Sequence, residues 1–269
     1  MRLTHYSPKP PLSQFVESIW ALNGGPNRPR ELVLPNGAIE LIINFGSYHK
    51  VVDKTNYDKF RVYRNSWIAG MQESYIIIEA VHESDLMGVR FRPGGAYPFL
   101  QFPARELTNE VVECDLIFGP LLSELRDRLY EASEYGARIR LVEEVLCKRI
   151  SAMLSDPLVD HVSKEICRNN GQKSIAQLSH EVGISHKQLI SRFRKTIGIS
   201  PKFLSRIVRF QSVIRLANGR MSVNWTEIAH RCGYYDQAHM IREFRLLSGA
   251  TPTNYLKHRD EDENHIILS

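Results

Sequence analysis

Cysteine is scarce in this sequence, and its spacing matches neither a disulfide framework nor a metal cluster. The 269-residue chain has four cysteines and no C-x-x-C motif; the four are Cys114, Cys147, Cys167 and Cys232. This spacing excludes a fold stapled by disulfides and a structural zinc cluster, and it fits a reducing compartment.

Long apolar runs are lacking as well. Segments such as "LIINF" and "YIIIEAV" are far shorter than the roughly 20 apolar residues that a membrane-spanning helix needs. The segment "MRLTHYSPKPPLSQF" has no apolar core behind a basic start, so it does not resemble a secretory signal. We therefore expect a soluble, cytoplasmic protein with no membrane partner.

Histidine pairs at metal-binding spacing are also missing. In the first half of the chain His5, His49 and His82 stand far apart, with no H-x-H or H-x-x-H motif. Metal-dependent barrel enzymes need such residues in one cluster. We expect no catalytic residues, no metal and no cofactor.

Positive charge is concentrated in the last third of the sequence. Residues 157–259 contain 17 Lys and Arg against 6 Asp and Glu, whereas residues 1–156 contain 18 against 20. Residues 260–269 hold four acids and no Lys or Arg, which predicts a solvated acidic tail. Clustered Lys and Arg release counterions from phosphates on binding, so the basic segment predicts a polyanion-binding domain. A basic but purely solvated surface is the alternative that charge alone leaves open.

The first part of the chain reads as short strands followed by helices. Residues 31–92 show period-two alternation and turn signals, among them Asn36-Gly37 between two apolar runs, which predicts a small barrel or sandwich. From residue 119 to about 154 apolar residues recur three to four apart, which predicts helices that close this domain or pair with another subunit. Asp156 is a predicted N-cap with Pro157 as the first helical residue, and we place the domain boundary there.

The basic segment contains an internal repeat. The stretch "IAQLSHEVGISHKQLISRFRKTIGISP" begins at Ile175, and "WTEIAHRCGYYDQAHMIREFRLLSGATP" begins at Trp225. Gly183 corresponds to Gly233, which gives a period of 50 residues. Each unit reads as a helix, a glycine turn and a second helix, over about residues 174–198 and 224–249. This is the pattern of a helix-turn-helix, whose second helix enters the major groove of DNA.

Helical geometry assigns two faces to the second helix of each unit. With Phe193 and Phe244 placed inward, polar and basic residues point away from the core. The predicted DNA-contacting residues are His186, Lys187, Ile190, Ser191 and Arg194 in the first unit and Gln237, Ala238, His239, Arg242 and Arg245 in the second. Of these, Lys187, His239 and Arg242 are the preferred base contacts, since basic side chains can bind guanine edges or clamp phosphates.

The segment between the units predicts a stiff connector. Residues 200–217 have a cap, a proline at the first position and apolar residues at helical spacing, for a helix about 27 Å long. Successive major grooves on one face of DNA lie about 34 Å apart. One chain could therefore place two reading helices in adjacent grooves.

These residues resemble the AraC/XylS family of bacterial transcription regulators. The resemblance is strongest in "IAHRCGYYDQAHMIREFRLLSGATPTNYL", which is similar to the family signature over its second helix-turn-helix, and it extends over residues 157–259. The segments "LPNGAIELIINFG" and "GVRFRPGGAYPFLQFPARELTN" are similar to the sensor domains of a subgroup. The first unit departs from the pattern, with Ser191 where a basic residue is common and Ser179 where alanine is usual, so the second unit carries the stronger signal.

The resemblance implies an α+β protein with two parts. A β-barrel-like (cupin-like) sensor and dimerisation domain with C-terminal helices would occupy residues 1–156, followed by an all-α DNA-binding domain of two helix-turn-helix units joined by a long helix. It implies binding to double-stranded promoter DNA, contact with RNA polymerase, most often activation, and possible partners in a small-molecule effector and a homodimer. Two alternatives stay open: an amino-terminal domain that only oligomerises, and a barrel enzyme fused to a DNA-binding module.

Overall fold

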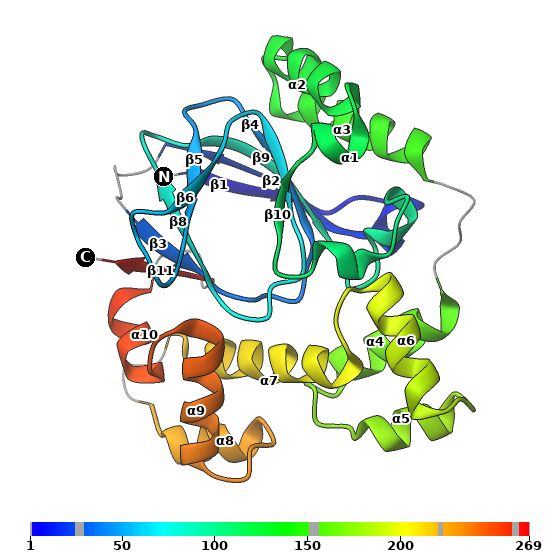
Figure 1. Cartoon of the computed structure of the whole chain (residues 1–269), viewed down its shortest axis with the longest axis vertical. Coiled ribbons are helices and arrows are strands. Elements are labelled where there is room, and N and C mark those ends of the chain that lie inside the picture. Colours follow the sequence, from blue (N-terminus) through cyan, green and yellow to red (C-terminus); the bar gives the residue numbers. More distant parts are fainter. Residues whose placement is uncertain (1, 25–29, 151–155, 220–222, 260–263, 269) are drawn as a thin grey trace.

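Two antiparallel β-sheets form the amino-terminal half of the protein, and helices form the rest (Figure 1). The structure is a computed structural model that describes residues 2–24, 30–150, 156–219, 223–259 and 264–268. Within these ranges no strand pairing joins the two sheets, so the barrel-like domain is an open sandwich. The predicted α+β organisation is confirmed.

The first sheet has six strands, and its order brings distant segments together. Hydrogen bonding places them in the order β1 (Arg2–Tyr6), β2 (Val16–Asn23), β9 (Asp85–Phe91), β4 (Glu40–Asn44), β7 (Ser66–Ala69) and β10 (Val111–Glu113). Strands β1, β2 and β10 lie outside the range 31–92 in which strands were expected. Their pairing is long-range, since β2 pairs with β9 about 70 positions later. The short alternation in "RLTHY" of β1 was too weak a local signal to predict a strand.

The second sheet has five strands and is completed from the far end of the sequence. Its order is β11 (His265–Leu268), β3 (Arg30–Val33), β8 (Ile76–Ala80), β5 (His49–Val52) and β6 (Phe60–Tyr63). The expectation of a solvated tail is wrong for residues 264–268, because β11 pairs with β3 and Ile266 is only 3% exposed. The four acids at residues 260–263 lie outside the described residues.

The predicted turn at Asn36-Gly37 forms, but it does not make a hairpin. Gly37 has a φ of 78°, and the Asn36 side chain accepts a hydrogen bond from the Ala38 amide. The strands on either side, β3 and β4, belong to different sheets. The turn therefore carries the chain from one layer to the other.

Buried apolar residues lie on both faces of the inner strands, which explains the continuous apolar runs in the sequence. In β4, Ile42 points into the space between the sheets, whereas Leu41 and Ile43 belong to the core on the other side of the first sheet. Leu32 and Ile77 of the second sheet pack outward against helices of the second half. The sandwich is thus the middle of the molecule, with helices on both outer surfaces (Figure 1).

Helices α1 (Asp115–Phe118), α2 (Leu121–Glu131) and α3 (Tyr135–Arg149) pack against the first sheet. Leu125, Leu129, Val142 and Leu146 share one core with residues of that sheet. These contacts support the predicted role of closing the domain. Residues 151–154, the end of the predicted helical range, lie outside the described residues.

The carboxyl-terminal helices follow the predicted order. They are α4 (Pro157–Arg168), α5 (Ile175–Glu181), α6 (His186–Thr196), α7 (Pro201–Ala217), α8 (Trp225–Arg231), α9 (Gln237–Ser248) and α10 (Pro252–His258). The predicted cap is confirmed, since Asp156 accepts hydrogen bonds from the amides of Leu158 and Val159. Short 3-10 helices also occur among the described residues, at Leu12–Gln14, Tyr97–Phe99 and Ala104–Leu107. In the described part of the chain no helix is both long and apolar enough to cross a membrane.

Candidate nucleic-acid interface

Each predicted unit folds as two helices joined by a glycine turn. Gly183 and Gly233 have φ angles of 68° and 74°, a left-handed conformation that lets the first helix end sharply. Ser185 and Gln188 then form a capping box at the start of α6, and Asp236 accepts a 2.6 Å hydrogen bond from the His239 amide at the start of α9. The cap residues Ser185 and Asp236 thus determine where the two second helices begin.

Apolar side chains seat both second helices on the domain. Leu189 and Phe193 of α6 are fully buried, and Met240 and Phe244 of α9 are at most 1% exposed. The Phe244 ring packs against Phe210 of α7, with 4.9 Å between ring centroids. The predicted inward faces are confirmed, which leaves the opposite faces of α6 and α9 turned outward.

Most of the predicted contact residues lie on these outward faces. The exposed ones are His186, Lys187, Ser191 and Arg194 on α6 and Ala238, Arg242 and Arg245 on α9, while Ile190, Gln237 and His239 are half-buried. Five of the seven exposed side chains are basic or imidazole, which gives both helices a surface suited to phosphates and base edges.

Two side chains at the start of α9 are engaged within the protein. The Gln237 amide oxygen accepts a 2.8 Å hydrogen bond from the Thr226 hydroxyl of α8, which ties the two helices of the unit together. The His239 ring lies edge-on to Tyr234, with centroids 5.4 Å apart. Gln237 therefore serves the turn, and Tyr234 orients His239.

Sequence reasoning missed Tyr235 as a candidate contact residue. Its side chain is 87% exposed and lies directly before the cap Asp236, beside the start of α9. The sequence gives no signal that separates it from Tyr234, which also lies between the glycine turn and the cap but is only 4% exposed.

The long helix α7 separates the two reading helices. It has 17 residues, which corresponds to a length of about 25 Å at 1.5 Å per residue. Figure 1 shows α6 and α9 at opposite ends of α7. The predicted connector is confirmed, and its length approaches the spacing of adjacent major grooves.

An ion pair fixes α9 on α7. The Arg206 guanidinium donates to both carboxylate oxygens of Glu243, at 2.8 and 3.0 Å, and the side chains are 23% and 14% exposed. This two-bond geometry sets the rotation of α9, because a planar fork binds a carboxylate in one orientation.

We expect the Arg206 and Glu243 side chains to show strong energetic coupling. In a double-mutant cycle of Arg206→Met and Glu243→Gln, followed by urea unfolding, we expect a coupling of about 1–3 kcal/mol, because both hydrogen bonds are charged and shielded. Arg231 and Glu227 on α8 are the matched control, since this pair is 3.5 Å apart and both side chains are 51% exposed. The control should give about 0.3–0.5 kcal/mol. Equal coupling in the two cycles would contradict a positioning role for Arg206.

The first reading helix is fixed to the sensor side of the molecule. Within the helical domain, Arg192 of α6 binds Asp156, the N-cap of α4, with its nitrogen 3.2 and 3.3 Å from the carboxylate oxygens. The Thr108 hydroxyl donates a 2.9 Å hydrogen bond to the Gly198 carbonyl just after α6. Both units therefore contact the sandwich, the second one through Tyr75, whose amide donates to the Leu247 carbonyl at 2.8 Å.

A cavity of about 180 Å³ lies between the two sheets. Its lining includes Trp20 and Trp67 from the first sheet, Glu31 from β3, and His265 from β11. Arg90 of β9 also lines this cavity, so its wall carries a cation as well as the Glu31 carboxylate.

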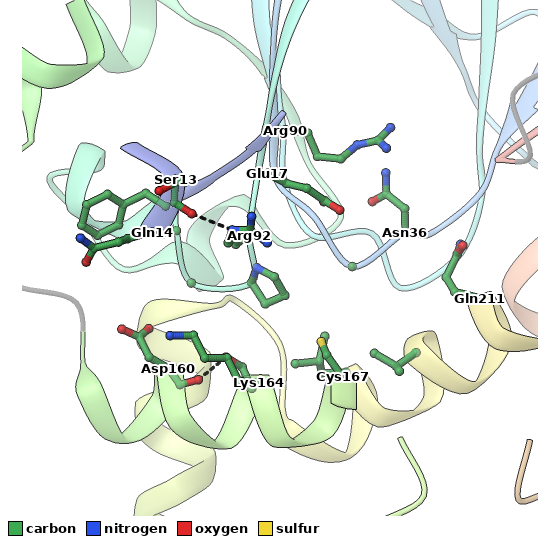
Figure 2. A pocket seen from close by; sticks show the side chains of 18 of the residues that line it. Ser13, Gln14, Glu17, Asn36, Arg90, Arg92, Asp160, Lys164, Cys167 and Gln211 are labelled. Atoms are coloured by element: carbon green, nitrogen blue, oxygen red, sulfur yellow. Dashed lines mark hydrogen bonds between the residues drawn. The ribbon is translucent and has the colours of Figure 1, made fainter. Parts of the chain in front are cut away.

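A second, larger cleft of about 680 Å³ separates the sandwich from helices α4 and α7 (Figure 2). Arg90, Asn36 and Gln211 lie around it from above and from the side, and Asp160 and Lys164 lie on α4 below. Arg90, Asn36 and Asn264 line both the cleft and the interior cavity. These three residues form the partition between the two spaces.

The partition is bonded to the connecting helix. Gln211 of α7 donates to the Pro35 carbonyl at 2.7 Å and to the Asn264 side-chain oxygen at 2.8 Å. The Leu34 amide donates to the Asn264 carbonyl at 2.8 Å. A change in the cavity wall at β3 or β11 is therefore mechanically connected to α7.

Two of the four cysteines, Cys114 and Cys232, are buried. Burial raises the pKa of Cys114 to about 12 and that of Cys232 to about 11, so both thiols are protonated at neutral pH. No group of three or more His, Cys, Asp or Glu with metal-binding geometry occurs among the residues that the structure describes.

Two family models match separate parts of the chain. One is described as a helix-turn-helix domain and matches residues 178–258, from α5 to α10. The other is described as a domain of unknown function, DUF6597, and matches residues 4–113, which contain nearly all of both sheets apart from β11.

Two curated relatives are similar to the chain over parts of their length. The arabinose operon regulatory protein of Escherichia coli (strain K12) is 24% identical over 196 residues, or 67% of this chain and 66% of that protein. The probable thc operon regulatory protein of Rhodococcus erythropolis is 26% identical over 145 residues, or 53% of this chain and 42% of that protein. The chain thus matches less than two thirds of the length of either relative.

A solved structure shares the arrangement of the whole chain. The structure of ToxT from Vibrio cholerae superposes with a TM-score of 0.52 at 10% identity, covering 90% of this chain and 98% of that one. At this identity the likeness concerns the fold alone: a sheet-rich amino-terminal domain followed by a helical domain.

Proposed function

The chain belongs to the AraC/XylS family of transcription regulators, and from this premise we propose that it binds promoter DNA through both helix-turn-helix units. We further propose that it regulates transcription, as an activator, under the control of a small-molecule effector bound by the amino-terminal domain. The observation that carries the proposal is the pair of outward-facing helices, α6 and α9, at the two ends of α7.

The proposed DNA contacts are the residues of the two outward faces. In the first unit they are His186, Lys187, Ile190, Ser191 and Arg194, and in the second Gln237, Ala238, His239, Arg242 and Arg245. Lys187, His239 and Arg242 are proposed to reach base edges, and the others to position the helices on the backbone. Since the Gln237 amide oxygen already accepts from Thr226, the proposed phosphate contact of Gln237 would use its NH2 group as donor.

The proposed division of labour follows the domain boundary near residue 156. Residues 1–156 would sense the effector and dimerise, and residues 157–259 would bind DNA and contact RNA polymerase in the cytoplasm of a bacterium. Both curated relatives are named operon regulatory proteins, which supports a sensing rather than a catalytic amino-terminal domain. The interior cavity and its hydrogen-bonded connection to α7 favour control by an effector. The alternative, an amino-terminal domain that only oligomerises, would not need such a cavity.

Selection of bound DNA from a random pool, followed by salt titration, tests the proposal. We expect a site with two blocks about 10 base pairs apart, one for each reading helix, because adjacent major grooves repeat at that distance. Affinity should fall steeply with salt as counterions are released. A recovered site with a single block would overturn the paired-unit mechanism.

Replacing Arg242 by alanine is expected to relax specificity at one base position. The exposed guanidinium on the outward face of α9 is suited to a bidentate contact with guanine, so its loss should cost about 1–3 kcal/mol at that position. Binding of the variant to a panel of single-base site variants measures this. If the variant weakens binding uniformly across the panel, Arg242 contacts phosphate instead.

A further inference from the structure

The interior cavity has a flat, mostly apolar lining. Six of its large lining residues are apolar and come from both sheets: Trp20, Leu22, Ile42, Trp67, Ile76 and Leu86. Its volume of about 180 Å³ is close to the roughly 150 Å³ that suffices for one aromatic ring in an apolar protein cavity.

Gly88 shapes one wall of this space. It stands beside Trp20 on one neighbouring strand and Ile42 on the other. A Cβ atom at this position would lie 2.1 Å from the Trp20 ring. The indole therefore lies flat across β9, where it offers a ring-sized apolar surface to the cavity.

The carboxylates in the lining already have partners. Glu40 accepts from Arg90 at 2.9 Å, from Asn36 at 2.7 Å and from the Trp20 indole N–H at 3.2 Å. Glu31 lies 2.7 Å from Nδ1 of His265. A ligand with a net charge would compete with these pairs, and breaking one of them would leave a shielded charge without its partner, which is costly.

On β9, β4 and β7 the charged side chains of the cavity lie in one row and the large apolar side chains in the next, which ends at His5 on β1 beside Trp20. Glu40 and Arg90 are opposite each other on β4 and β9, and the next cavity-facing row contains Ile42, Gly88 and Trp67. The polar row lies at the partition with the interdomain cleft, since Arg90 lines both spaces. A bound molecule would place its ring between the tryptophans and a hydrogen-bonding group at the partition.

We propose that the effector site accepts a neutral, single-ring apolar compound with one hydrogen-bonding group. This rests on the proposed function, which places an effector in the amino-terminal domain, and it adds the chemical class of that effector. The partition residue Asn264 accepts a hydrogen bond from Gln211, so the polar group of the ligand would lie beside residues that are bonded to α7.

Three probes of similar size and different charge test the inference: acetophenone, benzoate and benzylammonium. The readout is the indole N–H resonance of each tryptophan in the ¹⁵N-labelled full chain. Acetophenone should shift the signals of Trp20 and Trp67 and leave that of Trp225 on α8 unchanged. The two charged probes should bind at least about tenfold more weakly, because they must disrupt an existing pair.

Ala69→Leu supplies the matched blocking variant. Ala69 lines the cavity at the end of β7, whereas Ala80 at the end of β8 does not, so Ala80→Leu is the control. Acetophenone binding should be lost in the first variant and retained in the second. If Ala69→Leu does not fold, the comparison of the three probes with the unmodified chain still decides.

The outcomes separate this inference from the proposed function. Equal binding of all three probes, tighter binding of a charged probe, a response limited to Trp225, or no binding would each overturn the ligand class. Failure of the proposed function would appear in a different measurement, because DNA selection by the full chain needs no probe. A chain that selects a two-block site and binds none of the probes keeps the DNA-binding proposal and loses this one.

Discussion

Replacing Phe244 by alanine is expected to lower the free energy of unfolding by about 3–5 kcal/mol and to remove specific DNA binding by the second unit. Phe244 is 1% exposed and lies between Phe210 of α7 and Tyr255 of α10, with ring centroids 4.9 and 5.7 Å away. Its loss would leave a cavity where three helices meet. Urea unfolding and binding to the selected DNA site measure the two effects.

Leu246→Ala is the matched control on the same helix. Leu246 is 63% exposed, so its truncation removes little buried surface and should change the free energy of unfolding by no more than about 0.5 kcal/mol. Equal destabilisation by both variants would mean that α9 is not seated through Phe244. A stable Phe244→Ala variant with normal DNA binding would contradict the seating argument altogether.

Replacing Ile266 by alanine should lower the free energy of unfolding by about 2–5 kcal/mol. This is a large effect for a residue that follows a highly charged segment. Ile266 is 3% exposed, pairs with Leu32 of β3 and belongs to the core shared with Phe210 and Val213 of α7. The substitution removes apolar contacts on the side of the second sheet that faces the DNA-binding units. Thermal unfolding of the full chain should therefore begin at a lower temperature.

Ile267→Ala provides the comparison within the same strand. Ile267 points to the opposite side of β11 and is half-buried. Ile267→Ala should therefore lower the free energy of unfolding clearly less than Ile266→Ala. If both variants unfold like the unmodified chain, β11 does not contribute to stability and residues 264–268 behave as the solvated tail expected from composition.

The helices could be predicted from the sequence because their signals are local. Asp156, Ser185 and Asp236 cap the helices that follow them, and Gly183 and Gly233 end the helices before the turns. Each of these effects operates within about one helical turn, so a single sequence contains all the information. The inward faces of α6 and α9 follow from the same periodicity.

The sheets could be predicted only in part, because strand pairing is decided far away in the sequence. The turn at Asn36-Gly37 was correctly located, yet its strands join different sheets because their partners are β8 and β9. Strand β11 could not be predicted, because the four residues of "HIIL" after an acidic run are too few to show a periodic pattern. Its burial depends on pairing with β3, more than 200 positions earlier.

The outward position of most candidate contact residues could be predicted from the sequence, whereas the contacts that some of them make inside the protein could not. The outward position of Arg242 follows from helical geometry, but the bond between Gln237 and Thr226 joins two helices and has no signature in either. The Arg206–Glu243 pair likewise joins α7 and α9 over 37 positions. The interior cavity needs both sheets and β11 at once, so no single segment could reveal it.

Strand β11 also imposes an order on the folding of the newly made chain. The ribosome makes residues 1–156 first, but the edge of β3 and the His265 side of the cavity can be completed only after both DNA-binding units have been made. The sensor therefore reaches its finished form last, even though most of it is synthesised first. A fragment that ends near residue 156 would lack a wall of the cavity that it is meant to contain, and expression of the sensor alone should include β11 as a fused or added peptide.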